Sequence, residues 1–233
     1  MTYRESATAV PGAVLWRRAA TPAPGPLLIL PDGCLDLIWD GRRLWVAGPD
    51  TTARQFQGSS PYQSVALRFS GGLGPAVLGV PADELTDRSV DLEQVWSAAE
   101  ARRLTEQVAE DPVTAMTTWL LARADRSPPD PLGARVATMA AGGLPVATMA
   151  DRTGLSARQL HRRCLPLFGY GPRHLARVLR LLRALDEGRA GLPLAEVAAE
   201  SGYYDQAHLS REVRALTGTT PTALLTGSGG SDG

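Results

Sequence analysis

The sequence predicts an α+β protein with two unlike halves. Short apolar runs separated by Gly and Pro turns fill residues 1–90, which predicts a small antiparallel β sheet or barrel. Helical periodicity follows in residues 91–125 and would cover that sheet. Beyond residue 131, a helix-turn-helix pattern occurs twice, which predicts an all-α domain of two such units joined by a long helix.

The β-rich half is predicted from five runs with strand character, at residues 13–18, 27–30, 34–39, 44–47 and 64–69. Asp40-Gly41 lies between two of them and is typical of a hairpin turn. Helices are then expected from the spacing in 91–125, with Asp111 and Pro112 capping and starting one of them. We expect these helices to cover the sheet.

The domain boundary is expected at residues 127–131, where Ser-Pro-Pro-Asp-Pro forms a stiff linker. Residues 1–126 would then be a ligand-sensing or dimerisation domain, and 132–226 the helix-turn-helix domain. Residues 227–233 are Gly- and Ser-rich and are expected to be a disordered tail.

Residues 194–221 predict a helix-turn-helix unit. Leu194, Val197 and Ala198 recur at helical spacing, and Gly202 follows where a tight turn needs positive φ. Asp205 can cap a second helix whose buried stripe leaves one face outward. That face carries Gln206, Ala207, Ser210 and Arg211. Gln, Ser and Arg read base edges, although such helix pairs also occur in all-α proteins that do not bind DNA.

The repetition of the pattern upstream favours DNA binding. Gly154 precedes Gly202 by 48 residues, whereas Arg162 precedes Arg211 by 49, so the second turn carries one inserted residue. Ser-Ala-Arg-Gln at 156–159 has the form of a capping box that starts the second helix of this unit. Its outward face carries Arg158, His161 and Arg162.

Residues 131–225 as a whole resemble the tandem helix-turn-helix domain of the AraC/XylS transcriptional regulators. The resemblance is carried by Ser-Gly-Tyr-Tyr-Asp-Gln-Ala-His-Leu-Ser-Arg at 201–211 and Gly-Thr-Thr-Pro at 218–221. It implies two recognition helices in successive major grooves of double-stranded DNA, with the two outward faces above as the base-contacting positions. Residues 30–39, 46–49 and 78–87 resemble the N-terminal domain of one AraC-type subgroup, with a Pro-Asp-Gly-Cys motif.

The sequence departs from that family at three positions. Cys164 and Val213 stand where the family usually has Phe, which keeps an apolar position but makes it smaller. Pro166 removes a helical hydrogen bond, so the first recognition helix is expected to kink or end near Leu165.

A long connector helix is expected over residues 172–187, beginning at Pro172. Its arginines recur at i, i+4, i+7 and i+10 and form one basic stripe. They are Arg173, Arg177, Arg180 and Arg183. The stripe is either a solvated face or a contact with DNA phosphates.

Charge separates the two halves, although the whole chain has 24 basic and 24 acidic residues. Residues 131–227 hold twelve Arg and seven acids (+5), whereas 1–130 hold twelve Arg and sixteen acids (−4). All 24 basic residues are Arg, which excludes a Lys Schiff base and a P-loop lysine. The two cysteines lie in different predicted domains and no signal or membrane segment is seen, so a cytoplasmic protein without membrane contact is expected.

The β-rich half offers candidates for a small-molecule pocket. They are Trp16, Cys34, Trp39, Trp45, Tyr62 and Phe69, which are equally well explained as the core of a small sheet. All three histidines follow residue 160, so this half lacks a His-rich metal site or a Ser-His-Asp triad. No cofactor and no metal are expected.

The function expected from the sequence is a sequence-specific transcriptional regulator, not an enzyme. Its N-terminal domain would sense a small molecule, form a homodimer, or do both, and an activator would also contact RNA polymerase. The alternative is a covalent sensor or enzyme domain fused to a DNA-binding domain, with Cys34 accepting the transferred group.

Overall fold

The first half of the chain folds around a six-stranded antiparallel sheet. The structure is a computed structural model that describes residues 3–19, 27–56 and 63–226. The strands lie in the order β1-β2-β7-β4-β5-β8, and β3 pairs with β6 in a separate ribbon. Their bounds are β1 Tyr3–Ala7, β2 Ala13–Arg18, β3 Leu27–Ile29, β4 Leu35–Trp39, β5 Leu44–Ala47, β6 Arg54–Phe56, β7 Ser64–Phe69 and β8 Ser89–Asp91.

The two faces of the sheet belong to two apolar clusters, because alternate strand residues point to opposite sides. Leu37 and Leu67, paired across β4 and β7, are fully buried in the large cluster with the helices of this half. Ile38 and Ala66, paired one residue further along, join Trp16 in a small cluster on the other face. The small cluster therefore lies on the face away from those helices.

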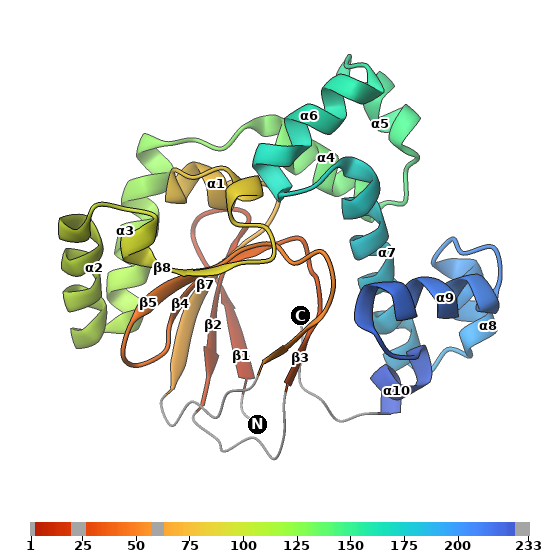
Figure 1. Cartoon of the computed structure of the whole chain (residues 1–233), viewed down its shortest axis with the longest axis horizontal. Helices are drawn as coiled ribbons and strands as arrows, with labels where there is room; N and C mark the ends of the chain where they lie inside the picture. The colour runs from red at the N-terminus through yellow and green to blue at the C-terminus, as the bar shows by residue number, and fades with distance from the viewer. Residues whose placement is uncertain (1–2, 20–26, 57–62, 227–233) are drawn as a thin grey trace.

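Helices cover one face of the sheet, as Figure 1 shows for α2 and α3. They are α1 Leu73–Leu78, α2 Ala98–Glu110 and α3 Pro112–Arg126, with short 3-10 turns η1 at Ala82–Glu84 and η2 at Leu92–Gln94. Asp111 caps α3 by accepting a hydrogen bond from the Thr114 amide at 3.1 Å, and Pro112 is its first residue. Both features were predicted.

The second half consists of seven helices within the described residues, and it completes the predicted α+β architecture. They are α4 Pro131–Ala141, α5 Val146–Thr153, α6 Ala157–Phe168, α7 Pro172–Arg189, α8 Leu194–Glu200, α9 Gln206–Thr217 and α10 Pro221–Thr226. The first unit, α5 and α6, and the second unit, α8 and α9, each have their own apolar core, and α7 contributes to both.

The two halves lie side by side, with α7 running beside the sheet domain (Figure 1). At 18 residues, α7 spans about 27 Å. The predicted tail at 227–233 lies outside the described residues.

Candidate nucleic-acid interface

The second recognition helix, α9, is built as the sequence predicts. Gly202 makes the turn with φ of 75°, and Asp205 caps α9 by accepting from the His208 amide at 2.6 Å. Leu209, Val213 and Leu216 are at most 1% exposed and form the buried stripe. On the opposite face Gln206, Ala207 and Arg211 are exposed and Ser210 is half-buried.

The first recognition helix, α6, has the same design with a different cap. The Ser156 hydroxyl accepts from the Gln159 amide at 3.2 Å, and the Gln159 side chain accepts from the Ser156 amide at 2.9 Å. This is the predicted capping box. Leu160 and Cys164 are fully buried, and the outward side chains Arg158, His161 and Arg162 are exposed.

The candidate base readers differ from neighbouring arginines in their contacts. Arg163, next to Arg162, is engaged with the Asp130 carboxylate at 2.6 Å. Arg158, Arg162 and Arg211 make no hydrogen bond or ion pair with the described part of the chain. Their guanidinium donors therefore remain available to a partner such as the edge of guanine.

Pro166 does not end the first recognition helix, so that part of the prediction was wrong. Helix α6 continues to Phe168, and Gly169 closes it in the left-handed conformation with φ of 78°. The lost hydrogen bond and ring clash cost about 3 kcal/mol. Burial of Leu167 and Phe168, at 9% and 1% exposure, offsets that cost.

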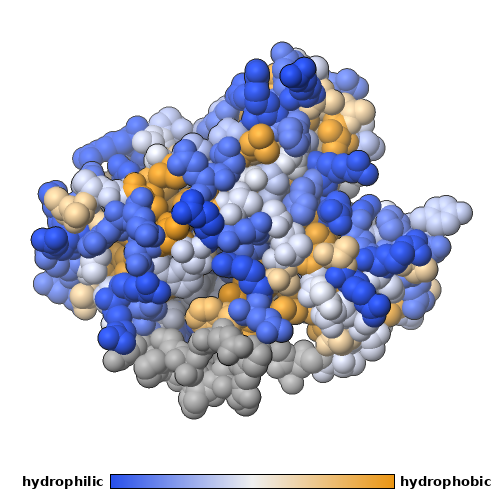
Figure 2. All heavy atoms as spheres, in the orientation of Figure 1, coloured by the Kyte–Doolittle hydropathy of each residue, from blue (hydrophilic) through white to orange (hydrophobic). Residues whose placement is uncertain are grey.

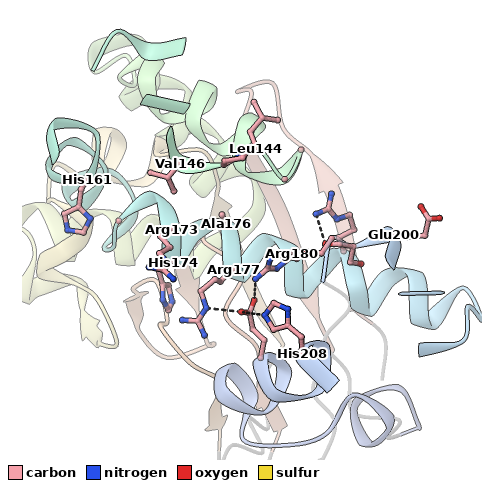
Figure 3. A pocket seen from close by; sticks show the side chains of 18 residues that line it. Leu144, Val146, His161, Arg173, His174, Ala176, Arg177, Arg180, Glu200 and His208 are labelled. Atoms are coloured by element: carbon pink, nitrogen blue, oxygen red, sulfur yellow. Dashed lines mark hydrogen bonds and ion pairs between the residues drawn. The ribbon is translucent and has the colours of Figure 1, made fainter. Parts of the chain in front are cut away.

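A groove of about 1080 Å³ lies between the two units and along α7. Figure 3 shows the side chains that line it, and His161 of the first unit and His208 of the second both face it. Glu212 of α9 also lines it and bonds across to α7: its carboxylate is 2.5 Å from Arg180 and 3.5 Å from Arg177. The groove therefore connects both units on a surface rich in arginine.

Two arginines of the basic stripe on α7, Arg180 and Arg183, make contacts within the protein. The Arg180 guanidinium lies 4.5 Å over the Tyr203 ring in addition to bonding Glu212. Arg183 donates to the Ala141 carbonyl at the end of α4 at 3.2 Å and to the Ser201 carbonyl of the second unit at 3.4 Å. Arg180 therefore ties α7 to the second unit, Arg183 links the end of α4 to the end of α8, and Arg173 is left exposed.

The residue inserted in the second turn is Tyr204. Leu155 and Tyr203 follow the two turn glycines, and Ser156 and Asp205 are the two caps, so Tyr204 has no counterpart in the first unit. It is 92% exposed beside the start of α9. The spacing of 48 and then 49 residues pointed to this position, but only the structure identifies the residue.

The predicted small-molecule set is divided between the two faces of the sheet. Trp39 and Phe69 belong to the large helix-covered core, whereas Trp16 belongs to the small cluster, with Trp45 packed against it. These four do not line one pocket. Tyr62 lies outside the described residues.

Cys34 belongs to a charged cluster near that second face. Asp32, whose carboxylate accepts from the Cys34 amide at 2.9 Å, lies 3.4 Å from Arg68, which also meets Asp36 at 3.2 Å. Burial, and then the Asp32 charge, raise the pKa of the Cys34 thiol well above its ordinary value. A thiol held in the protonated form is a poor nucleophile, which argues against the covalent-sensor alternative.

Neither a metal-binding cluster nor a membrane-spanning helix occurs in the described part of the chain. Among its residues, no three His, Cys, Asp or Glu side chains are grouped so that they could hold a metal ion. In the same part of the chain, no helix has the length and hydrophobicity that a membrane crossing requires.

Comparison with solved structures finds similar folds at low identity. Three crystal structures of ToxT from Vibrio cholerae are each 9% identical to this chain. An apo variant has a TM-score of 0.45 and covers 96% of this chain and 95% of its own. Another crystal form has 0.46, covering 97% and 100%, and a complex of ToxT with an unsaturated fatty acid has 0.45, covering 95% and 89%.

Comparison with protein families assigns both halves of the chain, whereas no curated protein matches it. Residues 149–227 match a helix-turn-helix domain, and residues 13–91 match a domain of unknown function, DUF6597. The first match begins within α5 and includes α6, α7, α8 and α9. Residues 149–227 are therefore a helix-turn-helix domain of the AraC type, and residues 13–91 are a DUF6597 domain.

Proposed function

We propose that this DNA-binding regulator reads two half-elements of one DNA site, one with each recognition helix. Arg158, Arg162, Gln206 and Arg211 would contact base edges, and His161, Ala207 and Ser210 would complete the two contact surfaces. The observation that carries the proposal is the free, exposed arginine on the outer face of both α6 and α9. Centres about 34 Å apart along the duplex would place the two helices in successive major grooves.

The sheet face that carries Trp16 and Trp45 is the proposed site for a small-molecule effector. It lies away from the covering helices, and the buried indole nitrogen of Trp45 has no hydrogen-bond partner in the described structure. A ligand with an acceptor group would satisfy this donor. Its binding would shift the equilibrium between arrangements of the two halves and needs no chemical step.

Homodimerisation through α2 and α3 remains a prediction. The outward face of α2 is largely charged, α3 exposes mainly small and polar side chains, and Leu121, at 45% exposed, is the large apolar side chain they present. A dimer there would therefore rest on polar contacts more than on an apolar core. Contact with RNA polymerase remains a prediction for the case of an activator.

Selection of bound fragments from a random duplex library, at two salt concentrations, tests the proposal. We expect enrichment of a site with two half-elements about one helical turn apart, retained at the higher salt. Enrichment of a single short element would show that one unit reads alone. Binding without any enrichment would overturn sequence-specific recognition.

A further inference from the structure

Residues 49–53, the segment between β5 and β6, contact both helix-turn-helix units. Pro49 packs against Gly169 at the end of α6, where an added Cβ would come within 2.6 Å of the proline ring. The Ala53 amide donates to the Leu216 carbonyl in the last turn of α9 at 2.7 Å. One short segment of the sheet domain therefore touches the C-terminal ends of both recognition helices.

The same segment is tied firmly to its own domain. Asp87 accepts hydrogen bonds from the Thr51 amide and from the Thr51 hydroxyl, both at 2.7 Å, and its own amide donates to the Pro49 carbonyl at 3.1 Å. Asp87 adopts a φ of 55°, which side-chain-bearing residues rarely do. A strained residue held by three hydrogen bonds indicates a segment whose position is fixed by the sheet domain.

Thr51, the middle residue of this segment, contacts the start of the connector helix α7. The ring nitrogen Nε2 of His174, in the first turns of α7, lies 3.1 Å from the Thr51 carbonyl oxygen. Thr86, next to Asp87, adds a hydrogen bond from its hydroxyl to the Gly169 carbonyl at 3.1 Å. The sheet domain thus meets α6, α7 and α9 within a few residues of chain.

We infer that residues 49–53 set the distance and angle between the two recognition helices, and through them the spacing of the half-elements that the protein accepts. The contacts lie at the C-terminal ends of α6 and α9. The N-terminal halves, with Arg158 and Gln206, stay exposed and free to enter a groove. The inference rests on the proposed double reading and adds a specificity-determining role for the sheet domain.

A matched pair of glycines tests it. Gly169 and Gly218 close α6 and α9 with nearly the same φ, 78° and 73°, so alanine strains the backbone equally at both. At Gly169 the added methyl would also lie 2.4 Å from the Thr86 hydroxyl, whereas at Gly218 nothing lies within 4 Å. Only Gly169→Ala pushes the sheet domain away from a recognition helix.

The first readout needs no DNA. Spin labels at Arg158→Cys and Gln206→Cys, in a Cys34→Ser background, report the distance between the recognition helices in the full chain. We expect one narrow distance distribution for the parent and for Gly218→Ala, and a broadened or shifted one for Gly169→Ala. Thr86→Val is isosteric and removes the hydrogen bond to Gly169, so it should broaden the distance distribution less than Gly169→Ala does. It also tests the inference if Gly169→Ala does not fold.

The second readout uses unlabelled protein on duplexes whose half-element spacing is changed by one or two base pairs. The parent and Gly218→Ala should prefer the selected spacing by about tenfold or more, and Gly169→Ala by threefold or less. An unchanged distance distribution in both Gly169→Ala and Thr86→Val would overturn the inference. A narrow parent distribution that broadens as expected, with no paired half-elements selected, would instead refute the proposed double reading.

Discussion

The two helix-turn-helix units share one plan but are fixed in place by different kinds of contact. The first unit packs against the sheet domain by close approach of small residues, with Gly133 of α4 against the backbone of Gly71. The second unit is tied mainly to α7 through Glu212 and two arginines. Close packing tolerates no added atoms, whereas ion pairs respond to charge and salt. Different mutations should therefore destabilise one unit without destabilising the other.

The largest expected effect is on the first unit. A methyl group at Gly133 would lie 2.3 Å from the Gly71 carbonyl oxygen, so Gly133→Ala should lower the free energy of unfolding by about 1–3 kcal/mol. Gly142→Ala, near the end of the same helix, meets nothing closer than 3.4 Å and should change it by less than about 0.5 kcal/mol. Urea unfolding of both variants checks this, and equal stabilities would contradict close packing at Gly133.

The next effect concerns the second unit. Glu212→Gln leaves Arg177 and Arg180 without their carboxylate in a partly buried setting, which should cost about 2 kcal/mol. Hydrogen exchange should speed up in α9 and not in α6. Asp186→Asn, which alters an exposed pair with Arg189 on the same helix α7, is the control and should cost less than about 0.5 kcal/mol. Faster exchange spread equally over both units would contradict a local role for Glu212.

A smaller effect is expected in the pH dependence of the free energy of unfolding, through Asp50 in the segment 49–53. Burial raises the pKa of Asp50 to about 6 from its ordinary 3.8, against the attraction of Arg54 at 2.6 Å. Because the folded pKa is the higher one, the folded state holds the proton more tightly, and stability is lost as pH rises through 6. The loss attributable to Asp50 should be about 1 kcal/mol between pH 4 and 7 after solvent screening.

Asp50→Asn checks this prediction. Its free energy of unfolding, measured at a series of pH values, should fall by about 1 kcal/mol less over this range than that of the parent. Identical pH profiles for parent and variant would show that Asp50 titrates normally in the folded protein.

The smallest effect distinguishes the units at their turns. Tyr204, present only in the second unit and 92% exposed, makes little contact that folding would need. Because its exposed ring lies beside the start of the recognition helix α9, where one contact with DNA is within reach, we expect Tyr204→Ala to leave the free energy of unfolding within about 0.5 kcal/mol and to weaken DNA binding by about 1 kcal/mol. Fluorescence anisotropy measures the affinity for DNA, and urea unfolding measures the stability. A loss of stability with unchanged affinity would show that Tyr204 stabilises the fold and does not contact DNA.

Much of the fold was predictable because its signals are local. The boundaries of β2, β5 and β7 agree with the predicted runs, and the caps at Ser156, Asp205 and Asp111 were read from short patterns. Strand β1 was missed because Tyr-Arg-Glu-Ser-Ala is mostly polar, and β6 and β8 were missed because Arg-Gln-Phe and Ser-Val-Asp are only three residues long. Pairing with neighbours, which is not local, makes them strands.

The candidate site was predictable in part for the same reason. Helical periodicity separates the outward residues of α6 and α9 from the buried ones. It does not show that Arg180 and Arg183 turn toward the neighbouring units, because that depends on the fold of residues far along the chain. The described aromatic residues that were predicted to line one pocket lie on opposite faces of the sheet. Their faces depend on the pairing register of several strands, which the sequence does not show. Helix α6 does not end near Leu165, because burial of Leu167 and Phe168 offsets one lost hydrogen bond.

The measurement that tests double reading most directly is affinity for a selected duplex and for two versions with one half-element scrambled. Arg162→Ala and Arg211→Ala should each cost about 1–3 kcal/mol on the intact duplex, and each should lose its effect on one scrambled version only, a different one for each variant. Arg163→Ala, whose guanidinium is held by Asp130, should change little. If both variants weaken binding equally on all duplexes, the arginines contact only phosphate and the account is contradicted.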